Sequence, residues 1–376
     1  MRIPFNRAAI VGRERAYMDE ALAQGHISGD GPFTKRCERL LESSLGVPRV
    51  LLTTSCTHAL EIAALLLHLE PGDEVLLPSF TFVSTANAFA LHGATPVFVD
   101  VREDTLNLDE ALLEAKISPR TRAIVPVHYA GIGCEMERIL QLARGRGIRV
   151  VEDAAHGLFG KRGGRWLGTS GDLATFSFHE TKNVTCGEGG ALVVNDAALV
   201  ERAEILREKG TDRSRFFRGQ VDKYTWVDTG SSYVLSDLLA AFLLGQLEER
   251  ERIQARRRVL FERYAAGLAD WAREQGVRLP SIPADAEPAW HLFHLLLPDI
   301  GTRQRLLAWL RDAEILAVFH YLPLHDSPMG RTFGYRRGDC PVSESVSDRL
   351  ARLPLFFDLA EGDQERIIDR ILDFRV

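Results

Sequence analysis

Short apolar runs alternate with helical stretches between residues 50 and 208, and this alternation limits the fold more than any other feature of the chain. Such runs are typical of strands buried on both faces, and helices between them favour parallel pairing. We therefore expect a doubly wound, mostly parallel α/β domain over roughly residues 10–250. The predicted strands are residues 50–52, 74–77, 96–99, 123–127, 150–151, 174–178 and 191–194, and the predicted helices are 33–45, 59–68, 83–92, 135–144 and 196–208.

A second, smaller unit follows this domain, because 376 residues are too many for one small core. A helix rich in arginine and glutamate, from residue 238 to about 270, is interpreted as a long connector. Three prolines between residues 280 and 288 then introduce a predicted α+β domain. Its expected strands are 290–297 and 316–319, and its expected helices are 302–313 and 363–372. We place the large domain at residues 1–250 and the small domain at 251–376.

Charge and cysteine content argue against several classes of function. A net charge of -6 and a pI near 6.0 give no electrostatic reason to bind nucleic acid or an anionic membrane. No apolar run approaches the roughly 18–20 residues that span a bilayer, and the first residues show no secretion signal. Five scattered cysteines without a C-x-x-C pair argue against a disulfide framework and a structural zinc site. We expect a cytoplasmic protein without a bound metal.

One lysine stands out chemically within the stretch ATFSFHETKNVTCGEGG at residues 174–190. Lys182 follows a predicted strand, with Ser177 five residues before it and a glycine-rich turn after it. A desolvated amine has a lowered pKa, and its neutral form attacks an aldehyde to form a Schiff base. The alternative is an ordinary surface lysine in a loop.

Three other segments are expected at the same edge of the sheet, where ligands of such folds bind. The stretch TTSCTH at residues 53–58 precedes a helix and suits a phosphate, although hydroxyls also serve as plain N-caps. The stretch VVEDAAH at 150–156 ends in two carboxylates and a histidine, and one of the carboxylates can face a basic ring nitrogen. Otherwise Asp153 caps a helix and Glu152 faces solvent. The stretch PSFTF at 78–82 offers an aromatic ring for stacking, or for the core.

Together these segments supply a phosphate cradle, a stacking ring, a carboxylate for a pyridine nitrogen and an amine for an aldehyde. That set describes the needs of pyridoxal 5'-phosphate. The motifs of other common sites are missing, since the chain has no G-x-x-x-x-G-K-[ST], no H-E-x-x-H and no G-x-S-x-G. A pyridoxal-phosphate enzyme is therefore the function that the residues favour.

Longer motifs carry a resemblance to a known family. They are PSFTFVSTAN at 78–87, PVHYAG at 126–131, VEDAAH at 151–156 and FSFHETKN at 176–183. On these the chain resembles, nearly end to end, the DegT/DnrJ/StrS family of nucleotide-sugar aminotransferases. The resemblance implies the aspartate-aminotransferase-like fold (fold type I) and bound pyridoxal 5'-phosphate. RGQVDKYTW at 218–226 and FHYLPLH at 319–325 further imply glutamate-dependent amination of dTDP-4-keto-6-deoxyglucose at C4, on the way to surface polysaccharide.

The resemblance also assigns roles residue by residue. Lys182 would hold the cofactor and shuttle protons, Asp153 would face the pyridine nitrogen, and His156 would lie near the ring hydroxyl. Phe82 would stack on the ring, where many relatives have Trp or Tyr. The phosphate would be held by Thr57, His58 and Ser177.

Substrate binding and assembly follow from the same comparison. The resemblance implies a homodimer with shared active sites, to which each partner usually contributes an asparagine. Ser232 stands at that position here, and Val234 stands where the family has arginine. Whether Ser232 replaces that contact stays open. The expected substrate ligands are Arg213, Arg218, Lys223, His320 and Tyr321. For the three basic residues, the alternative is a solvated loop without a ligand. For His320 and Tyr321, the alternative is a buried structural role.

Rival functions on the same fold remain. A sugar dehydratase would have histidine in place of Lys182, and a non-enzymatic regulator would not need the pair of Lys182 and Asp153. A lyase or desulfurase would need a reactive cysteine, for which only Cys186 is near, and packing is its simpler role. Another nucleotide-sugar 3- or 4-aminotransferase is the nearest alternative.

Overall fold

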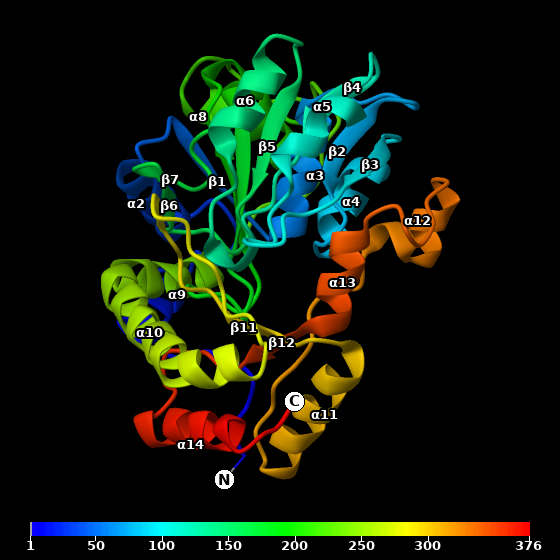
Figure 1. Ribbon diagram of the computed structural model, residues 1–376. Coiled ribbons are helices and arrows are strands. Elements are labelled where there is room, and N and C mark those ends of the chain that lie inside the picture. Colours follow the sequence, from blue (N-terminus) through cyan, green and yellow to red (C-terminus); the bar gives the residue numbers. More distant parts are fainter. Residues whose placement is uncertain (1) are drawn as a thin grey trace.

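The computed structural model describes residues 2–376. A large unit built on a seven-stranded sheet lies above a smaller unit that contains the C-terminal helices (Figure 1). The strand order is β1-β9-β8-β5-β4-β2-β3. The strands are β1 (Arg49–Thr53), β2 (Glu74–Pro78), β3 (Thr95–Val99), β4 (Thr121–Ile124), β5 (Arg149–Asp153), β8 (Leu173–Ser177) and β9 (Gly190–Val194). All seven predicted strands of the large domain are therefore present.

The sheet is mostly parallel, as expected, and one strand runs in the opposite direction. β2, β3, β4, β5 and β8 pair in parallel, whereas β9 runs antiparallel to both β8 and β1. The segment between β8 and β9 contains no helix to carry the chain back across the sheet. It turns at the sheet edge instead, with the Phe178 N–H donating to the Gly189 carbonyl over 2.8 Å. The sheet remains mostly parallel, and this turn carries Lys182.

Helices cover both faces of the sheet. One face packs against α2 and α9, and the other packs mainly against α3, with α4 and α7 beside it. Apolar strand residues alternate between these layers, with Leu52 in the first core and Leu51 in the second. The helices of this unit are α1 (Glu14–Gln24), α2 (Pro32–Leu45), α3 (Cys56–Leu66), α4 (Val83–Ala90), α5 (Leu113–Lys116), α6 (Met136–Arg144), α7 (Val200–Arg207), α8 (Arg213–Phe217) and α9 (Asp237–Glu248), with short 3-10 helices η1 (Glu110–Leu112), η2 (Tyr129–Gly131) and η3 (Ala197–Leu199).

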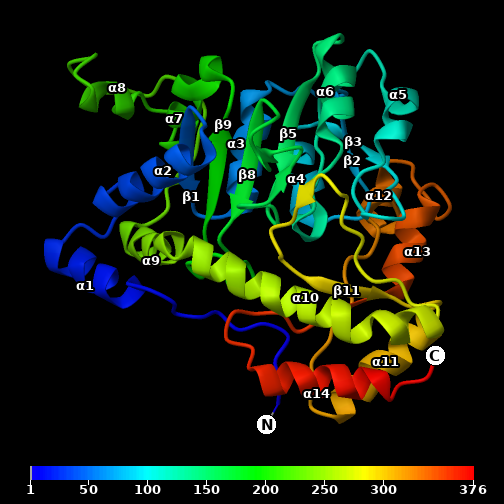
Figure 2. The ribbon, with the colours of Figure 1, turned by 60° about the vertical axis from the view of Figure 1, so that its left-hand side comes forward.

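The expected long connector is two helices. α9 ends at Glu248 and α10 (Arg250–Glu274) begins two residues later, after Glu249 departs from helical geometry at φ -94 and ψ 11. The two helices run in succession below the strands (Figure 2). Leu243 and Leu247 of α9 are fully buried in the core under the sheet, so α9 belongs to that core and α10 alone bridges to the smaller unit.

The smaller unit packs around a two-stranded antiparallel sheet. Its elements are β11 (Phe293–Leu296), α11 (Ile300–Asp312), η4 (Leu324–Asp326), α12 (Pro328–Thr332), α13 (Pro341–Arg349), β12 (Leu350–Leu353) and α14 (Glu361–Leu372). β6 (Lys161–Arg162), β7 (Arg165–Trp166) and β10 (Ala286–Glu287) form a further small sheet. The expected strand at 316–319 is absent, because only Val318 bridges to Arg352 there.

The N-terminal residues also reach this smaller core. Ile3 is buried in it and its backbone pairs with the segment around Ile315. In the described part of the chain, no helix is both long and apolar enough to cross a bilayer, and no cluster of three metal-binding side chains occurs.

Candidate active site

A cavity of about 850 Å³ lies where the carboxyl ends of the parallel strands face the smaller unit. Both units line it: the strand ends and their loops form one wall, and the chain around β11 and β12 forms the other. Among its lining residues are Thr57, Phe82, Asp153, His156, Ser177, Lys182, His291, His320, Tyr321 and Arg352. Eight of these were expected from the sequence. Thr57, Phe82, Asp153, His156, Ser177 and Lys182 belong to the large unit, and His320 and Tyr321 belong to the smaller unit.

Lys182 occupies the loop between β8 and β9, where its backbone N–H donates to the His179 carbonyl over 2.9 Å. Burial lowers the pKa of Lys182 to about 8, and the charge of Arg352 acts in the same direction. Asp153 and Cys56 act against this shift. An appreciable share of the amine is therefore neutral near neutral pH, and the neutral amine is the nucleophilic and basic form.

Asp153 ends β5 and its carboxylate is almost fully buried at the cavity wall. Oδ2 accepts the hydroxyl proton of Thr85 over 2.7 Å, and Oδ1 accepts the backbone N–H of Ala155 over 3.1 Å. Thr85 in turn lies 2.9 Å from the hydroxyl of Thr81. These donors fix the carboxylate in position beside Lys182.

The neighbouring carboxylate, Glu152, points to the opposite side of the strand. It is fully buried, and it accepts hydrogen bonds from His128 Nε2 over 2.8 Å and from the backbone of Gly168, Ser170 and Gly171 over 2.6 to 2.9 Å. Burial alone would raise the pKa of Glu152, but His128 and the backbone donors outweigh it and hold the pKa below its ordinary value. The alternative in which Glu152 faces solvent is therefore wrong.

The start of α3 forms a cradle for an anion. Ser55 caps the helix by accepting the N–H of His58 over 3.1 Å, and the hydroxyls of Thr57 and Ser84 lie 2.8 Å apart. The N–H groups of Cys56 and Thr57 in the first turn have no carbonyl within the helix to bind. Cys56, Thr57 and Ser177 all line the cavity, and a helix N-terminus beside hydroxyl groups is an arrangement that binds phosphate.

Gly190 and His58 lie next to the cradle and show how it is built. A Cβ at Gly190 would lie 2.3 Å from the Cys56 nitrogen, so only glycine on β9 lets α3 begin this close to the sheet. His58 does not line the cavity. Its Nδ1 bonds to the Thr54 hydroxyl, its ring packs edge-on against Tyr233, and its backbone N–H donates to the Ser55 hydroxyl.

Aromatic and imidazole rings form the remaining walls. Phe82 is 56% exposed at the cavity, whereas Phe80 of the same motif is buried in the core. The His156 ring stacks on His291 at a centroid distance of 4.2 Å, and its buried Nδ1 has no hydrogen-bond partner within residues 2–376. Burial holds the pKa of His156 well below its ordinary value, so the ring is neutral.

The smaller unit adds His320 and Tyr321. The His320 Nδ1 lies 2.9 Å from the Tyr129 hydroxyl, and the His320 ring lies 3.5 Å from the Tyr321 ring. Burial raises the pKa of Tyr321 and lowers that of His320, so both side chains are neutral. Both line the cavity, as expected for residues that could reach a substrate.

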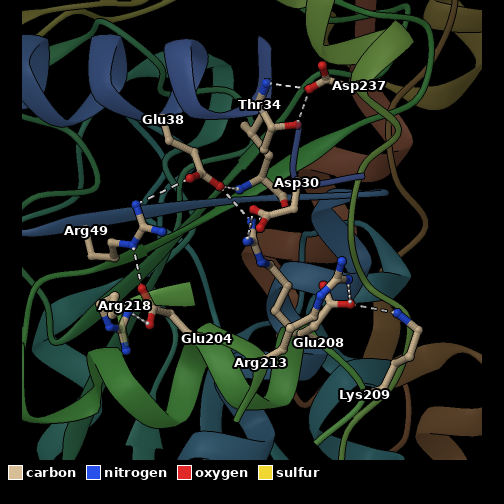
Figure 3. Close-up of polar contacts among 12 residues, drawn as sticks. Asp30, Thr34, Glu38, Arg49, Glu204, Glu208, Lys209, Arg213, Arg218 and Asp237 are labelled. Atoms are coloured by element: carbon tan, nitrogen blue, oxygen red, sulfur yellow. Dashed lines mark hydrogen bonds and ion pairs between the residues drawn. The ribbon is translucent and has the colours of Figure 1, made fainter. Parts of the chain in front are cut away.

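The basic residues expected to bind substrate lie outside this cavity within the same chain. Arg213 Nη1 bonds to Glu208 over 3.0 Å, and Arg218 Nη1 bonds to Glu204 over 2.6 Å (Figure 3). Lys223 is exposed in the loop after α8. Ser232 is exposed, and its backbone bridges to Glu208. The geometry of one chain therefore brings none of these residues to Lys182.

Sequence reasoning missed several cavity residues, among them Ser84, His291 and Arg352. Ser84 falls in the motif that includes Phe82, as the second residue of α4, and could have been found there. His291 and Arg352 come from the smaller unit and carry no local signal. Cys186 is buried outside the cavity lining, its thiol pKa is raised by burial, and its thiol contacts the Glu188 carbonyl, which fits a packing role.

The cavity fits pyridoxal 5'-phosphate. The helix-α3 cradle would hold the phosphate, Asp153 would face the ring nitrogen, and Lys182 would reach the aldehyde carbon. The open Nδ1 of buried His156 offers a partner for the ring hydroxyl. The fold and this site together define a pyridoxal-phosphate-dependent aminotransferase of fold type I.

Comparison with known proteins gives the family. The chain belongs to the DegT/DnrJ/EryC1/StrS aminotransferase family, whose model matches residues 9–372. Its members act on sugars with pyridoxal 5'-phosphate as cofactor.

Individual relatives cover nearly the whole chain. The Bacillus subtilis spore coat polysaccharide biosynthesis protein SpsC is 34% identical over 379 residues, which covers 99% of this chain and 96% of SpsC. The aminotransferase TlmJ from Streptoalloteichus hindustanus is 32% identical, with a TM-score of 0.91 over 99% of this chain and 98% of that structure. The PMP form of the sugar aminotransferase Spr1654 from Streptococcus pneumoniae is 28% identical, with a TM-score of 0.91 over 98% of each chain. Spr1654 is also known in a PLP form.

Proposed function

We propose that the protein transfers the amino group of glutamate to the C4 keto group of dTDP-4-keto-6-deoxyglucose and forms dTDP-4-amino-4,6-dideoxygalactose for surface polysaccharide. The observation that carries amino transfer is the amine of Lys182, buried in one cavity with the Asp153 carboxylate and an anion cradle. A dehydratase would have histidine at position 182. The name of the relative SpsC, which refers to spore coat polysaccharide, supports the destination of the product.

The chemistry divides between the cofactor and the protein. When bound, pyridoxal 5'-phosphate supplies an aldehyde that accepts the amino group and a ring that withdraws electrons from the carbon that loses its proton. Asp153, held by Thr85 and Ala155, provides the negative charge that keeps the ring nitrogen protonated. Neutral His156 donates or accepts at the ring hydroxyl without adding charge.

Lys182 moves the protons. With a pKa of about 8 it takes the proton from the α-carbon of glutamate as a neutral amine, and it returns a proton to C4 of the sugar as an ammonium. A base with a pKa near the working pH serves in both directions, because both forms are populated. Phe82 of the large unit and Tyr321 of the smaller unit both line the cavity, with ring centres 6.2 Å apart.

The nucleotide requires a second group of residues. We propose a homodimer in which Arg213, Arg218 and Lys223 reach the diphosphate from the other copy of the chain, since they do not line their own cavity. Two exposed aromatic residues in the same segment, Phe217 at 65% and Trp226 at 76%, support an interface there. Arginine binds phosphate through two parallel N–H donors, which suits a diphosphate.

Purified protein loaded with cofactor tests the reaction. Glutamate should bleach the visible absorption band, and dTDP-4-keto-6-deoxyglucose should restore it. Lys182→Ala should remove both responses, while the matched control Lys161→Ala, a lysine stacked on Trp166 away from the cavity, should retain them. An unchanged band with glutamate would refute amino transfer. NMR of the product shows which sugar carbon carries the new amine. An amine at C3 would favour the alternative of another nucleotide-sugar aminotransferase.

Mixed dimers test the shared site. Lys182→Ala and Arg218→Ala each lose activity, but a mixture of the two can form dimers in which one site receives both intact residues. Activity in the mixture above that of either variant supports the shared arrangement. No gain on mixing would show that Arg218 acts within its own chain or not at all.

A further inference from the structure

Residues 211–226 form an arm of the large unit that carries α8. The arm is fixed at its base, where the backbone of Thr211 bridges to Trp226. Asp212 is buried there, and its carboxylate accepts the Thr225 N–H over 2.7 Å. Backbone pairing therefore holds the two ends of the arm together where it joins the unit.

The tip of the arm is attached differently. None of the residues of α8, which are all described, is buried. The Phe216 ring contacts Phe217 and Tyr224, at centroid distances of 5.6 and 5.8 Å, and both of these rings belong to the arm itself. A cavity of about 230 Å³ is lined by Ser214, Phe217 and Arg218 of the arm and by residues of α2, β1 and α7. Apolar packing therefore contributes little to the position of α8.

Ion pairs hold α8 to the unit instead. Three glutamates in α7 or directly after it each pair with one arginine of the arm: Glu201 with Arg215 over 3.4 Å, Glu204 with Arg218 over 2.6 Å, and Glu208 with Arg213 over 3.0 Å. The Glu204 and Glu208 side chains are only 7% and 9% exposed, whereas Glu201 is 59% exposed. Because exposed ion pairs contribute little, Glu204 and Glu208 hold the tip of the arm.

Both of these carboxylates also bind a second cation (Figure 3). Glu204 accepts Arg49 Nε over 3.2 Å, and Glu208 accepts Lys209 Nζ over 3.0 Å. Removing one partner of a buried ion pair is costly when it leaves the other charge alone. The arginines of the arm can leave without this cost, because each carboxylate keeps its second cation.

The arginines of the arm are also accessible to an anion. The Arg213 and Arg218 side chains are 40% and 43% exposed. Arg207 of the same cluster is only 4% exposed, and it pairs with Glu38 over 2.6 Å and with Asp30 over 2.8 Å. The cluster therefore combines one enclosed arginine with two that an incoming ligand can reach.

We propose that Glu204 and Glu208 compete with the diphosphate of the substrate for Arg218 and Arg213, and that they hold the arm while no nucleotide is bound. This inference rests on the proposed homodimer, in which these arginines reach the diphosphate in the other copy. The diphosphate takes the place of the two carboxylates, and Arg49 and Lys209 stay with them. An uncharged ligand cannot make this exchange, so the two glutamates favour a ligand that carries negative charge.

The first experiment measures nucleotide binding without reaction. dTDP is titrated calorimetrically into cofactor-loaded protein. Glu204→Gln and Glu208→Gln should each bind dTDP about 3- to 10-fold more tightly than wild type, because each variant removes one competing charge. No gain in either variant would overturn the inference.

Glu201→Gln is the matched control for this titration. Glu201 also pairs with an arginine of the arm, but the pair is exposed, so dTDP binding should stay within about 2-fold of wild type. An equal gain in all three glutamine variants would contradict the inference, because overall charge would then explain it.

The same titration with thymidine tests the exchange of charges. Thymidine has no phosphate, so none of the three variants should bind it more tightly than wild type. If Glu204→Gln gained as much affinity for thymidine as for dTDP, a change in the shape of the site would explain the gain. That result would contradict a competition between carboxylates and phosphates.

A second measurement needs no nucleotide. Amide hydrogen exchange at residues 213–218 should be faster in Glu204→Gln than in wild type or Glu201→Gln, because one of the two inner ion pairs is lost. Arg49 still pairs with Glu42 over 2.9 Å in this variant, so exchange in the core strands should be unchanged. Unchanged exchange at residues 213–218 would show that other contacts hold the arm, and the inference would fall.

Arg218→Ala separates this inference from the proposed function. If this variant binds dTDP as tightly as wild type, the proposed diphosphate contact is wrong. If it binds dTDP more weakly but Glu204→Gln and Glu208→Gln match wild type, the contact stands and the competition falls. If the two glutamine variants bind dTDP more tightly but glutamate leaves the visible band unchanged, the competition stands and the proposed amino transfer falls.

Discussion

Two adjacent carboxylates on β5 should respond oppositely to the loss of charge. Glu152 and Asp153 differ by one position, and strand alternation points the first into the protein and the second into the cavity. We therefore predict that Glu152→Gln lowers stability and leaves the chemistry largely intact. We predict that Asp153→Asn leaves stability largely intact and lowers activity.

The cost at Glu152 follows from its donors. The Cys134 N–H donates to His128 Nδ1 over 3.1 Å, so His128 carries its proton on Nε2 and donates it to Glu152. A glutamine amide can keep one acceptor oxygen, but its NH₂ group must then face the donors of His128 and Gly168. Two buried donors left without acceptors cost about 3–5 kcal/mol.

The thermal shift is set by the size of the chain. An unfolding entropy of about 2.1 cal/mol/K per residue gives about 0.8 kcal/mol/K for 376 residues. The Tm of Glu152→Gln should therefore fall by about 4–6 °C in cofactor-free protein, measured by calorimetry. The folded pKa of Glu152 lies below its unfolded value of 4.5, so this contribution is present above that pH and disappears as the pH falls through the folded pKa. The Tm values of wild type and Glu152→Gln should therefore converge at acidic pH.

Asp153→Asn should keep the Tm within about 1–2 °C, because an amide can still accept from Ala155 and donate to the Thr85 hydroxyl. Amino transfer should fall at least about 100-fold, since the ring nitrogen would lose its negative partner. An equal Tm for Glu152→Gln and wild type, or full activity in Asp153→Asn, would refute the assignment of the two faces.

Two further predictions concern the lysine and the cradle. In cofactor-free protein the rate of amine labelling at Lys182, measured by mass spectrometry, should rise with pH and inflect near pH 8, because the neutral amine is the form that reacts. An inflection near 10.5 would show that burial does not lower the pKa of Lys182. Gly190→Ala should lower both Tm and cofactor affinity, because the added Cβ meets Ser55 and Cys56 at 2.3 Å, whereas Gly362→Ala, with open space around it, should change neither. Equal cofactor affinity in both glycine variants would mean that the cradle tolerates displacement.

The sequence alone predicted the seven strands of the large domain, and its motifs named six residues that line the cavity from that domain: Thr57, Phe82, Asp153, His156, Ser177 and Lys182. Apolar runs reveal strands locally, and the carboxyl ends of parallel strands share one edge, so Lys182 and Asp153 could be placed together before any coordinates. The sequence predicted a mostly parallel sheet but did not show which strand runs antiparallel. β9 reverses because its connection has no helix. The helix predicted at 238–270 divides at Glu249, because α9 packs in the core under the sheet whereas most of the buried face of α10 packs in the core of the smaller unit.

Strand alternation alone did not show which carboxylate faces the cavity, since the phase along β5 stays open until the layers pack; Asp153 was assigned through the family resemblance. Glu152 is turned inward by His128 and by the loop at 168–171, which no local pattern links to it. The same holds for the basic residues around α8, which in one chain pair with Glu204 and Glu208 and do not line the cavity.

The amino-acid sequence by itself determined the chemistry of this protein: a lysine, a carboxylate and a helix N-terminus at the ends of parallel strands. The tertiary structure decided what faces them. Arg352 and His291 lie more than 100 residues from Lys182 and reach the cavity only because the smaller unit packs against the sheet edge. The physical reason is the sequence separation of the contacts. Strand and helix patterns arise from residues near one another in the sequence, whereas the cavity wall from the smaller unit forms only when that unit packs against the sheet.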